Sequence, residues 1–82
     1  MKPIDVTDYF IRNFGKSVVK AERRGSNVLV LYDEGDHFEL FYRWLVSEHA
    51  DLCRVLGSEV TRWDKNEIDP AKPLFEQFRL FP

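Results

Sequence analysis

The stretch from Gly35 to Gly57 constrains the fold most, because it carries the signals of one long helix. Asp36 and Glu39 form an acidic variant of the capping box at its start, and Gly57 supplies a stop at its end. Between these ends apolar residues recur at intervals of three and four, which is the period of one helix face. The members of this stripe are Phe38, Phe41, Tyr42, Leu45, His49, Leu52, Cys53 and Leu56. The pattern predicts a long central helix.

The first part of the same stretch also fits a strand. Its alternating apolar residues are Phe38, Leu40, Tyr42, Trp44 and Val46. The preceding residues 33–35 (Asp-Glu-Gly) could close a hairpin through a type I turn. On that interpretation three consecutive strands form and a helix begins only at Ser47. We favour the long helix, because the stripe continues unbroken to Leu56 and both ends are capped.

The strand interpretation gives the order helix, three strands, helix, which resembles the topology of double-stranded-RNA-binding domains. That family carries a lysine-rich motif at the start of its last helix. Residues 47–51 (Ser-Glu-His-Ala-Asp) are acidic and contain no lysine. The resemblance therefore extends to topology and supplies no counterpart of the family's phosphate-binding residues.

Shorter elements are predicted on either side of this stretch. Residues 5–15 favour a short helix that begins at Asp5 as N-cap and stops at Gly15. Residues 17–24 and 27–33 predict two strands joined by a tight Gly-Ser turn, and residues 59–64 are the best candidate for a third. We expect an α+β fold with a small antiparallel sheet of two or three strands. The sheet would pack against the short N-terminal helix and the long central helix.

The composition is that of a single globular domain spanning residues 1–82. The hydrophobic share is 44% and the aromatic share 15%, enough to build a core without disulfides. Residues 65–73 form a polar connector with two prolines. The apolar residues after it are unusual for a free tail, so we expect a C-terminal segment that docks on its own domain or on a partner.

No residue pattern points to catalysis or to a bound group. His49 and Cys53 stand four apart on the predicted helix, but a free cysteine on an apolar stripe is usually buried, and we interpret the pair as core. The acidic residues in 33–36 lack the spacing of a calcium-binding loop and are typical of a solvated turn. We predict no catalytic residue, no metal site, no cofactor, no small-molecule substrate and no enzyme.

Charge and hydropathy restrict the partners and the location. The formal net charge of −2 gives no global attraction to nucleic acid or to anionic lipid. The longest apolar run, residues 28–32, is far too short to span a bilayer. With one cysteine and no signal-peptide pattern at the N-terminus, we expect a cytoplasmic protein without a membrane role.

Protein binding is the function that the sequence favours. Leu40 and Trp44 lie off the main stripe of the predicted helix, so its first half is apolar on two sides, and the second side fits a partner surface. Aromatic residues and arginine dominate binding hot spots. We predict a small non-enzymatic interaction module, an adaptor, regulator or inhibitor, that binds a larger macromolecule or a second copy of itself. The predicted partner-binding residues are Leu40, Arg43, Trp44, Phe75, Phe78 and Phe81.

Nucleic-acid binding is the alternative. Lys16, Lys20, Arg23 and Arg24 concentrate positive charge on the first predicted strand and its turn. A basic strand beside aromatics can bind phosphate backbones, but lysine and arginine also protect edge strands from aggregation. We favour the protective role, because the rest of the chain is acidic.

Overall fold

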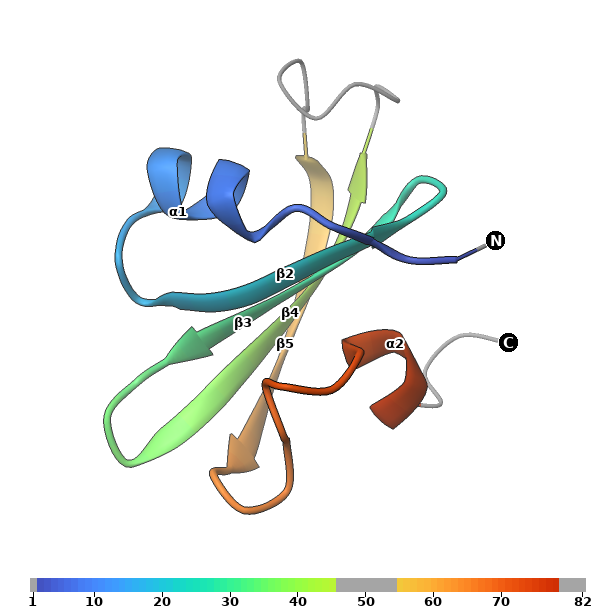
Figure 1. Cartoon of the computed structure of the whole chain (residues 1–82). Coiled ribbons are helices and arrows are strands. Elements are labelled where there is room, and N and C mark those ends of the chain that lie inside the picture. Colours follow the sequence, from blue (N-terminus) through green and yellow to red (C-terminus); the bar gives the residue numbers. More distant parts are fainter. Residues whose placement is uncertain (1, 46–54, 79–82) are drawn as a thin grey trace.

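The computed structural model describes the backbone of residues 2–45 and 55–78, and the side chains of residues 2–42 and 60–78. The elements are β1 (Ile4–Asp5), α1 (Thr7–Phe14), β2 (Val18–Arg24), β3 (Asn27–Asp33), β4 (His37–Leu45), β5 (Val55–Asp64) and α2 (Leu74–Gln77). The five strands form one antiparallel sheet in the order β1-β2-β3-β4-β5. Figure 1 shows this twisted sheet with α1 and α2 on opposite sides. No helix in the described part of the chain is long and apolar enough to span a membrane.

The prediction of a long central helix is wrong. Residues 37–45 form β4, in which Leu40 pairs with Leu31 on one side and with Thr61 on the other. The sheet accordingly has five strands, not two or three. The alternation of aromatic residues outweighs the helical stripe, because aromatic side chains favour a pleated, half-buried surface and neighbouring strands bury them on both sides. Residues 46–54 lie outside the described part.

The turn before β4 shows why the capping-box signal fails. The Asp33 carboxylate accepts the Gly35 N–H at 2.8 Å, and the Glu34 N–H donates to the His37 carbonyl at 3.0 Å. Gly35 adopts a φ of 95°, which favours glycine over any other residue. These bonds close a hairpin, so the acidic residues around Gly35 serve a turn and not the start of a helix.

The topology also departs from that of double-stranded-RNA-binding domains. The chain begins on a strand, β1, and a fifth strand, β5, follows the three that the resemblance implies. Residues 59–64, the predicted third strand, lie within β5. The predicted strands 17–24 and 27–33 are confirmed as β2 and β3, joined at Gly25 and Ser26.

Strand β3 is buried on both faces, as its unbroken apolar run predicts. Leu29 and Leu31 face the α2 side, whereas Val28 and Val30 face the α1 side, and all four side chains are fully buried. The core consequently has two layers. The α2 layer contains Leu29, Leu31, Phe38, Leu40, Tyr42, Ile68, Leu74, Phe75 and Phe78. The α1 layer contains Phe10, Val18, Ala21, Val28 and Val30.

A bulge in β2 aligns this strand with both layers. Val18 and Ala21 belong to the same layer although they are three residues apart, which strict alternation would not allow. The pairing with β3 shifts between Val18 and Lys20, so Val19 is the extra residue of a β-bulge. Because of this shift, Val19 packs against the α2 layer and the Lys20 side chain reaches the connector.

The C-terminal segment packs on its own sheet through a buried carboxylate. Glu22 of β2 is 4% exposed, and it accepts the N–H groups of Leu74 at 2.8 Å and Phe75 at 3.2 Å. The Lys20 ammonium lies 3.3 Å from the same carboxylate. A buried charge needs such partners, and the first turn of α2 needs acceptors for its free N–H groups. Glu22 therefore fixes α2 over the sheet.

Candidate protein-binding surface

The β1 edge of the sheet is closed by the chain itself. Strand β1 has two residues, and Pro3 precedes it. Beyond β1, the Val6 N–H donates to the Ala21 carbonyl at 2.9 Å, and the Ala21 N–H donates to the Thr7 hydroxyl at 3.0 Å. The start of α1 thus takes over the hydrogen-bonding groups of β2 where β1 ends, and a further strand has no place there.

The opposite edge is formed by β5, which pairs with β4; no described strand pairs with its other side. The bond from Glu34 to His37 shows that the odd-numbered residues at this end of β4 bond to β3. In an antiparallel ladder the alternate residues then bond to β5. The partners of these alternate residues in β5 are Thr61 and Trp63. The backbone groups of Val60 and Arg62 consequently point away from the sheet.

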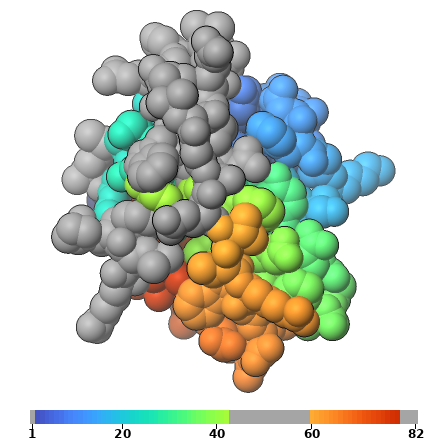
Figure 2. Space-filling model, turned by 180° about the vertical axis from the view of Figure 1, so that it is seen from behind, coloured from blue at the N-terminus to red at the C-terminus, as the bar shows by residue number. Residues whose placement is uncertain are grey.

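The outward edge ends at Asp64, whose backbone is already bonded. Its N–H donates to the Glu67 carboxylate at 3.2 Å, and its carbonyl accepts the Glu67 N–H at 3.0 Å. No described residue bonds to the outward groups of Val60 and Arg62. Figure 2 looks onto this side of the molecule, where residues 60–64, in orange, lie at the surface.

Apolar side chains flank this edge on the α1 side of the sheet. Val60 is 50% exposed and stands opposite Phe41 in the β4–β5 register. The Phe41 ring contacts the Tyr32 ring at a centroid distance of 4.6 Å, and both are half-buried. We call these residues together with the outward edge the β5 surface (Tyr32, Phe41, Val60, Thr61 and Arg62).

Charged groups of both signs border the β5 surface. Arg62 lies 3.9 Å from Asp36, and Asp36 in turn bonds to His37 Nδ1 at 2.6 Å. The other ring nitrogen of His37 lies 3.5 Å from Glu39. The hydrogen bond to Asp36 is the main cause that raises the pKa of His37 above 6.5, and the same bond lowers the pKa of Asp36 below 3.8.

The structure describes the side chains of three of the six predicted partner-binding residues. Leu40, Phe75 and Phe78 belong to the α2 layer of the core and are at most 6% exposed, so their side chains pack the fold. Leu40 was predicted as a contact residue because it lies on a second apolar side of the predicted helix. Residues 37–45 form a strand, so that side does not exist. Arg43 and Trp44 belong to β4, but their side chains lie outside the described set, as does the whole of Phe81.

The basic residues of β2 are mostly engaged within the chain. Lys20 donates to the Lys72 carbonyl at 2.9 Å, the Arg23 Nε donates to the Gly25 carbonyl at 2.7 Å, and the Arg24 guanidinium lies over the Phe75 ring. Lys16 is exposed. Because β2 lies between β1 and β3, protection of an edge strand is not their role either. Nucleic-acid binding by these four residues stays a prediction.

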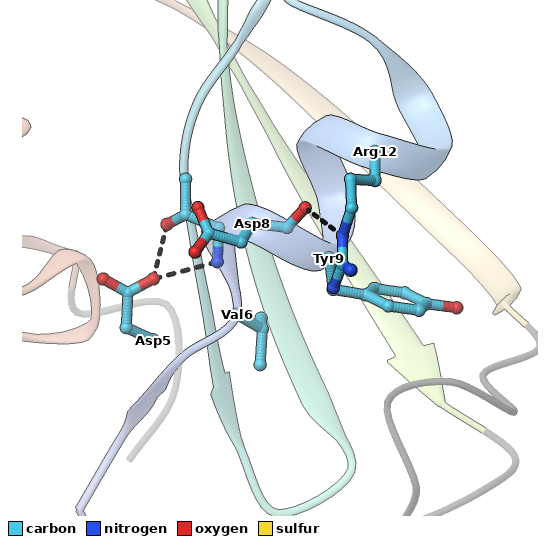
Figure 3. Close-up of a pocket in the computed structure, with 6 residues that line it drawn as sticks. Asp5, Val6, Asp8, Tyr9 and Arg12 are labelled. Carbon is cyan, nitrogen blue, oxygen red and sulfur yellow. Dashed lines mark hydrogen bonds between the residues drawn. The ribbon is translucent and has the colours of Figure 1, made fainter.

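A shallow depression at the start of α1 has a structural explanation. Figure 3 shows Asp5 and Tyr9 extending in opposite directions from it. The Asp5 carboxylate accepts the N–H of Thr7 at 2.9 Å and also its hydroxyl, and the hydroxyl bond is the main cause that lowers the pKa of Asp5. The predicted helix stop at Gly15 is thus confirmed. The predicted N-cap at Asp5 is wrong, because Asp5 belongs to β1, the helix begins at Thr7 and its N-cap residue is Val6. The polar groups here serve the helix end and not a ligand.

The β5 surface is the candidate site because its outward backbone groups have no partner among the described residues. Among the described residues, no three His, Cys, Asp or Glu side chains are grouped so that they could hold a metal ion. Comparison of the chain with protein-family models, curated proteins and solved structures found no match. The sequence prediction did not name Val60 or Phe41 as contact residues. The signal that could have found them is the strand pattern of residues 59–64 together with the alternating apolar residues around position 41.

Proposed function

We propose that this chain is a small, non-enzymatic protein-binding module that recognises its partner through the β5 surface. The single observation that carries the proposal is the difference between the two sheet edges. At the β1 edge the outer strand has two residues and the start of α1 bonds to β2 beyond it, whereas the outward groups of Val60 and Arg62 meet no partner in the described chain. Regularly spaced backbone donors and acceptors of this kind are recognised by another strand.

The side chains beside the edge support a protein partner. Val60 presents exposed apolar area next to Phe41, and the removal of such area from water stabilises a complex. Arg62, 68% exposed, stands at the rim, where a charge adds specificity more than affinity. An adaptor, a regulator or an inhibitor would each use such a surface. We place the module in the cytoplasm, a reducing compartment that suits a chain with one cysteine.

Paired substitutions at the two edges test the proposal. Val60 and Ile4 are both exposed apolar residues on outer strands, at 50% and 60% exposure. The baits are the wild type, Val60→Lys and Ile4→Lys, and captured proteins are quantified by mass spectrometry. We expect prey that is retained by wild type and Ile4→Lys and lost with Val60→Lys. Prey that Val60→Lys retains, or that both variants lose equally, would contradict recognition through the β5 surface.

A further inference from the structure

We propose that the partner is a second copy of this chain, paired antiparallel along β5 about a two-fold axis at Thr61. The inference rests on the proposed function, because it names the occupant of the same surface. It is carried by the self-complementary order of backbone hydrogen-bonding groups and side chains on that edge. The product is one continuous sheet shared by two copies.

The spacing of the outward groups is compatible with an axis at Thr61. Val60 and Arg62 lie one residue on either side of Thr61, and both direct their N–H and C=O groups away from β4. A two-fold axis at Thr61 places Val60 of each copy opposite Arg62 of the other. Opposed residues that both point toward the partner strand exchange two N–H···O=C bonds in an antiparallel ladder. All outward groups of these residues then have partners.

Side chains agree with this register. The two copies of Thr61 stand opposite each other on the α2 side, and threonine pairs are favourable cross-strand neighbours. On the α1 side, the aliphatic stem of Arg62 lies beside the exposed Val60 of the second copy and covers it. An axis at Arg62 would instead bring two guanidinium groups face to face, which is unfavourable.

The charges around the edge permit two copies to approach. The exposed basic residues Arg62 and Lys65 each lie near an acidic residue of their own chain, Asp36 and Asp33 respectively. Each Arg62 retains Asp36 of its own chain at 3.9 Å, which compensates its charge near the axis. An edge with charge of one sign would repel its own copy, whereas charges of both signs border this edge.

The contact is narrow, so the dimer is weak. A strand-to-strand contact of this length buries less than the roughly 1,200 Å² of a standard stable interface. We therefore expect reversible association in the micromolar to millimolar range, and no permanent dimer. Sedimentation equilibrium of the full chain should show an average mass that rises from 9.8 kDa toward about twice that value with concentration.

Charge substitutions at the axis provide the decisive test. Thr61→Lys and Thr61→Glu each place two like charges opposite each other, so each variant alone should associate at least about tenfold more weakly than the wild type. An equimolar mixture of the two places opposite charges together and should restore association. Loss of folding cannot produce such rescue. Ser26→Lys and Ser26→Glu, in the exposed turn between β2 and β3, are the matched controls and should sediment as the wild type does.

The outcomes separate this inference from the proposed function. A wild type that stays at the monomer mass up to millimolar concentration overturns the dimer. Variants that associate like the wild type, or a mixture that shows no rescue, also overturn it. In those cases the pull-down decides about the proposed function. If Val60→Lys still fails to capture a different protein that the wild type captures, the protein-binding function stands and the partner at this edge is that protein.

Discussion

At the β1 edge the outer strand is two residues long and is followed at once by α1, whereas at the other edge the ten-residue β5 ends the sheet. Thr7 and Val6 satisfy the backbone of β2 on the closed side. Val60 and Arg62 have no such partner among the described residues on the open side. Proteins normally protect the edge strands of their sheets. A sheet with one protected and one unprotected edge therefore indicates that a partner binds at the unprotected edge.

Both edges expose an apolar residue, so exposure alone does not distinguish them. Ile4 of β1 and Val60 of β5 have similar accessibility. What differs is the length of the strand that carries them. Strand β1 has two residues, follows a proline and leads directly into α1, so a strand added outside it would find few donors and acceptors, whereas the ten-residue β5 offers a longer row. Substitutions on the closed side should therefore lower the free energy of unfolding, whereas substitutions on the open side should weaken association.

The largest expected effect is on the closed side, at Glu22. Glu22→Ala removes the acceptor for the N–H groups of Leu74 and Phe75 and should lower the free energy of unfolding by about 2–4 kcal/mol in urea denaturation. Glu22→Gln keeps an acceptor and should lose less. A change below about 0.5 kcal/mol for Glu22→Ala would show that α2 does not depend on this carboxylate.

Thr7 should give the next largest effect, because it closes the β1 edge. Thr7→Val retains the shape of the side chain but leaves the Ala21 N–H without its acceptor, at a cost of about 1–3 kcal/mol in thermal or chemical unfolding. Thr7→Ser retains the hydroxyl and is the matched control. Equal stabilities of the valine and serine variants would mean that this hydroxyl does not close the edge.

Substitution of Val60, on the open side, should weaken association and leave the stability of the fold nearly unchanged. Val60→Lys replaces an exposed side chain outside both core layers, so the free energy of unfolding at low protein concentration should change by less than about 0.5 kcal/mol. Association should nevertheless weaken. A loss of stability above about 1.5 kcal/mol would place Val60 in the core and remove the distinction between the edges.

The smallest effect concerns pH at the rim of the open edge. The bond to Asp36 raises the pKa of His37 in the folded state, so its stabilising contribution is complete below the ordinary pKa of 6.5 and is lost as the pH rises through the folded value. The free energy of unfolding should thus decline slightly on the alkaline side of pH 6.5, and His37→Asn should flatten that decline. An unchanged pH profile in the variant would show that this pair contributes nothing.

Local turn and capping chemistry made part of the fold predictable. The short N-terminal helix with its stop at Gly15 and the tight turn at Gly25 each depend on residues close in sequence, and the structure has both. Only the helix start differs, because Asp5 extends the sheet as part of β1 and the helix begins at Thr7. The both-sided burial of β3 was also visible, because an unbroken apolar run needs cover on both faces. These features require no knowledge of distant partners.

The stretch after Gly35 could not be decided locally. Its apolar residues satisfy a period of 3.6 and a period of 2 together, so the choice depends on which neighbours are present to bury them. Strands β3 and β5 supply those neighbours for β4. The predicted contact residue Leu40 followed the wrong period and lies in the core. The open edge of β5 was not predictable, because an edge is defined by the absence of a further strand.

Amide hydrogen exchange of single β5 residues, compared at low and high protein concentration, tests the central claim most directly. The N–H groups of Thr61 and Trp63 bond to β4 and should be protected at both concentrations. Those of Val60 and Arg62 should exchange rapidly in dilute solution and become protected when the protein is concentrated. Protection of Val60 and Arg62 that is already complete in dilute solution would contradict the account, as would fast exchange at both concentrations.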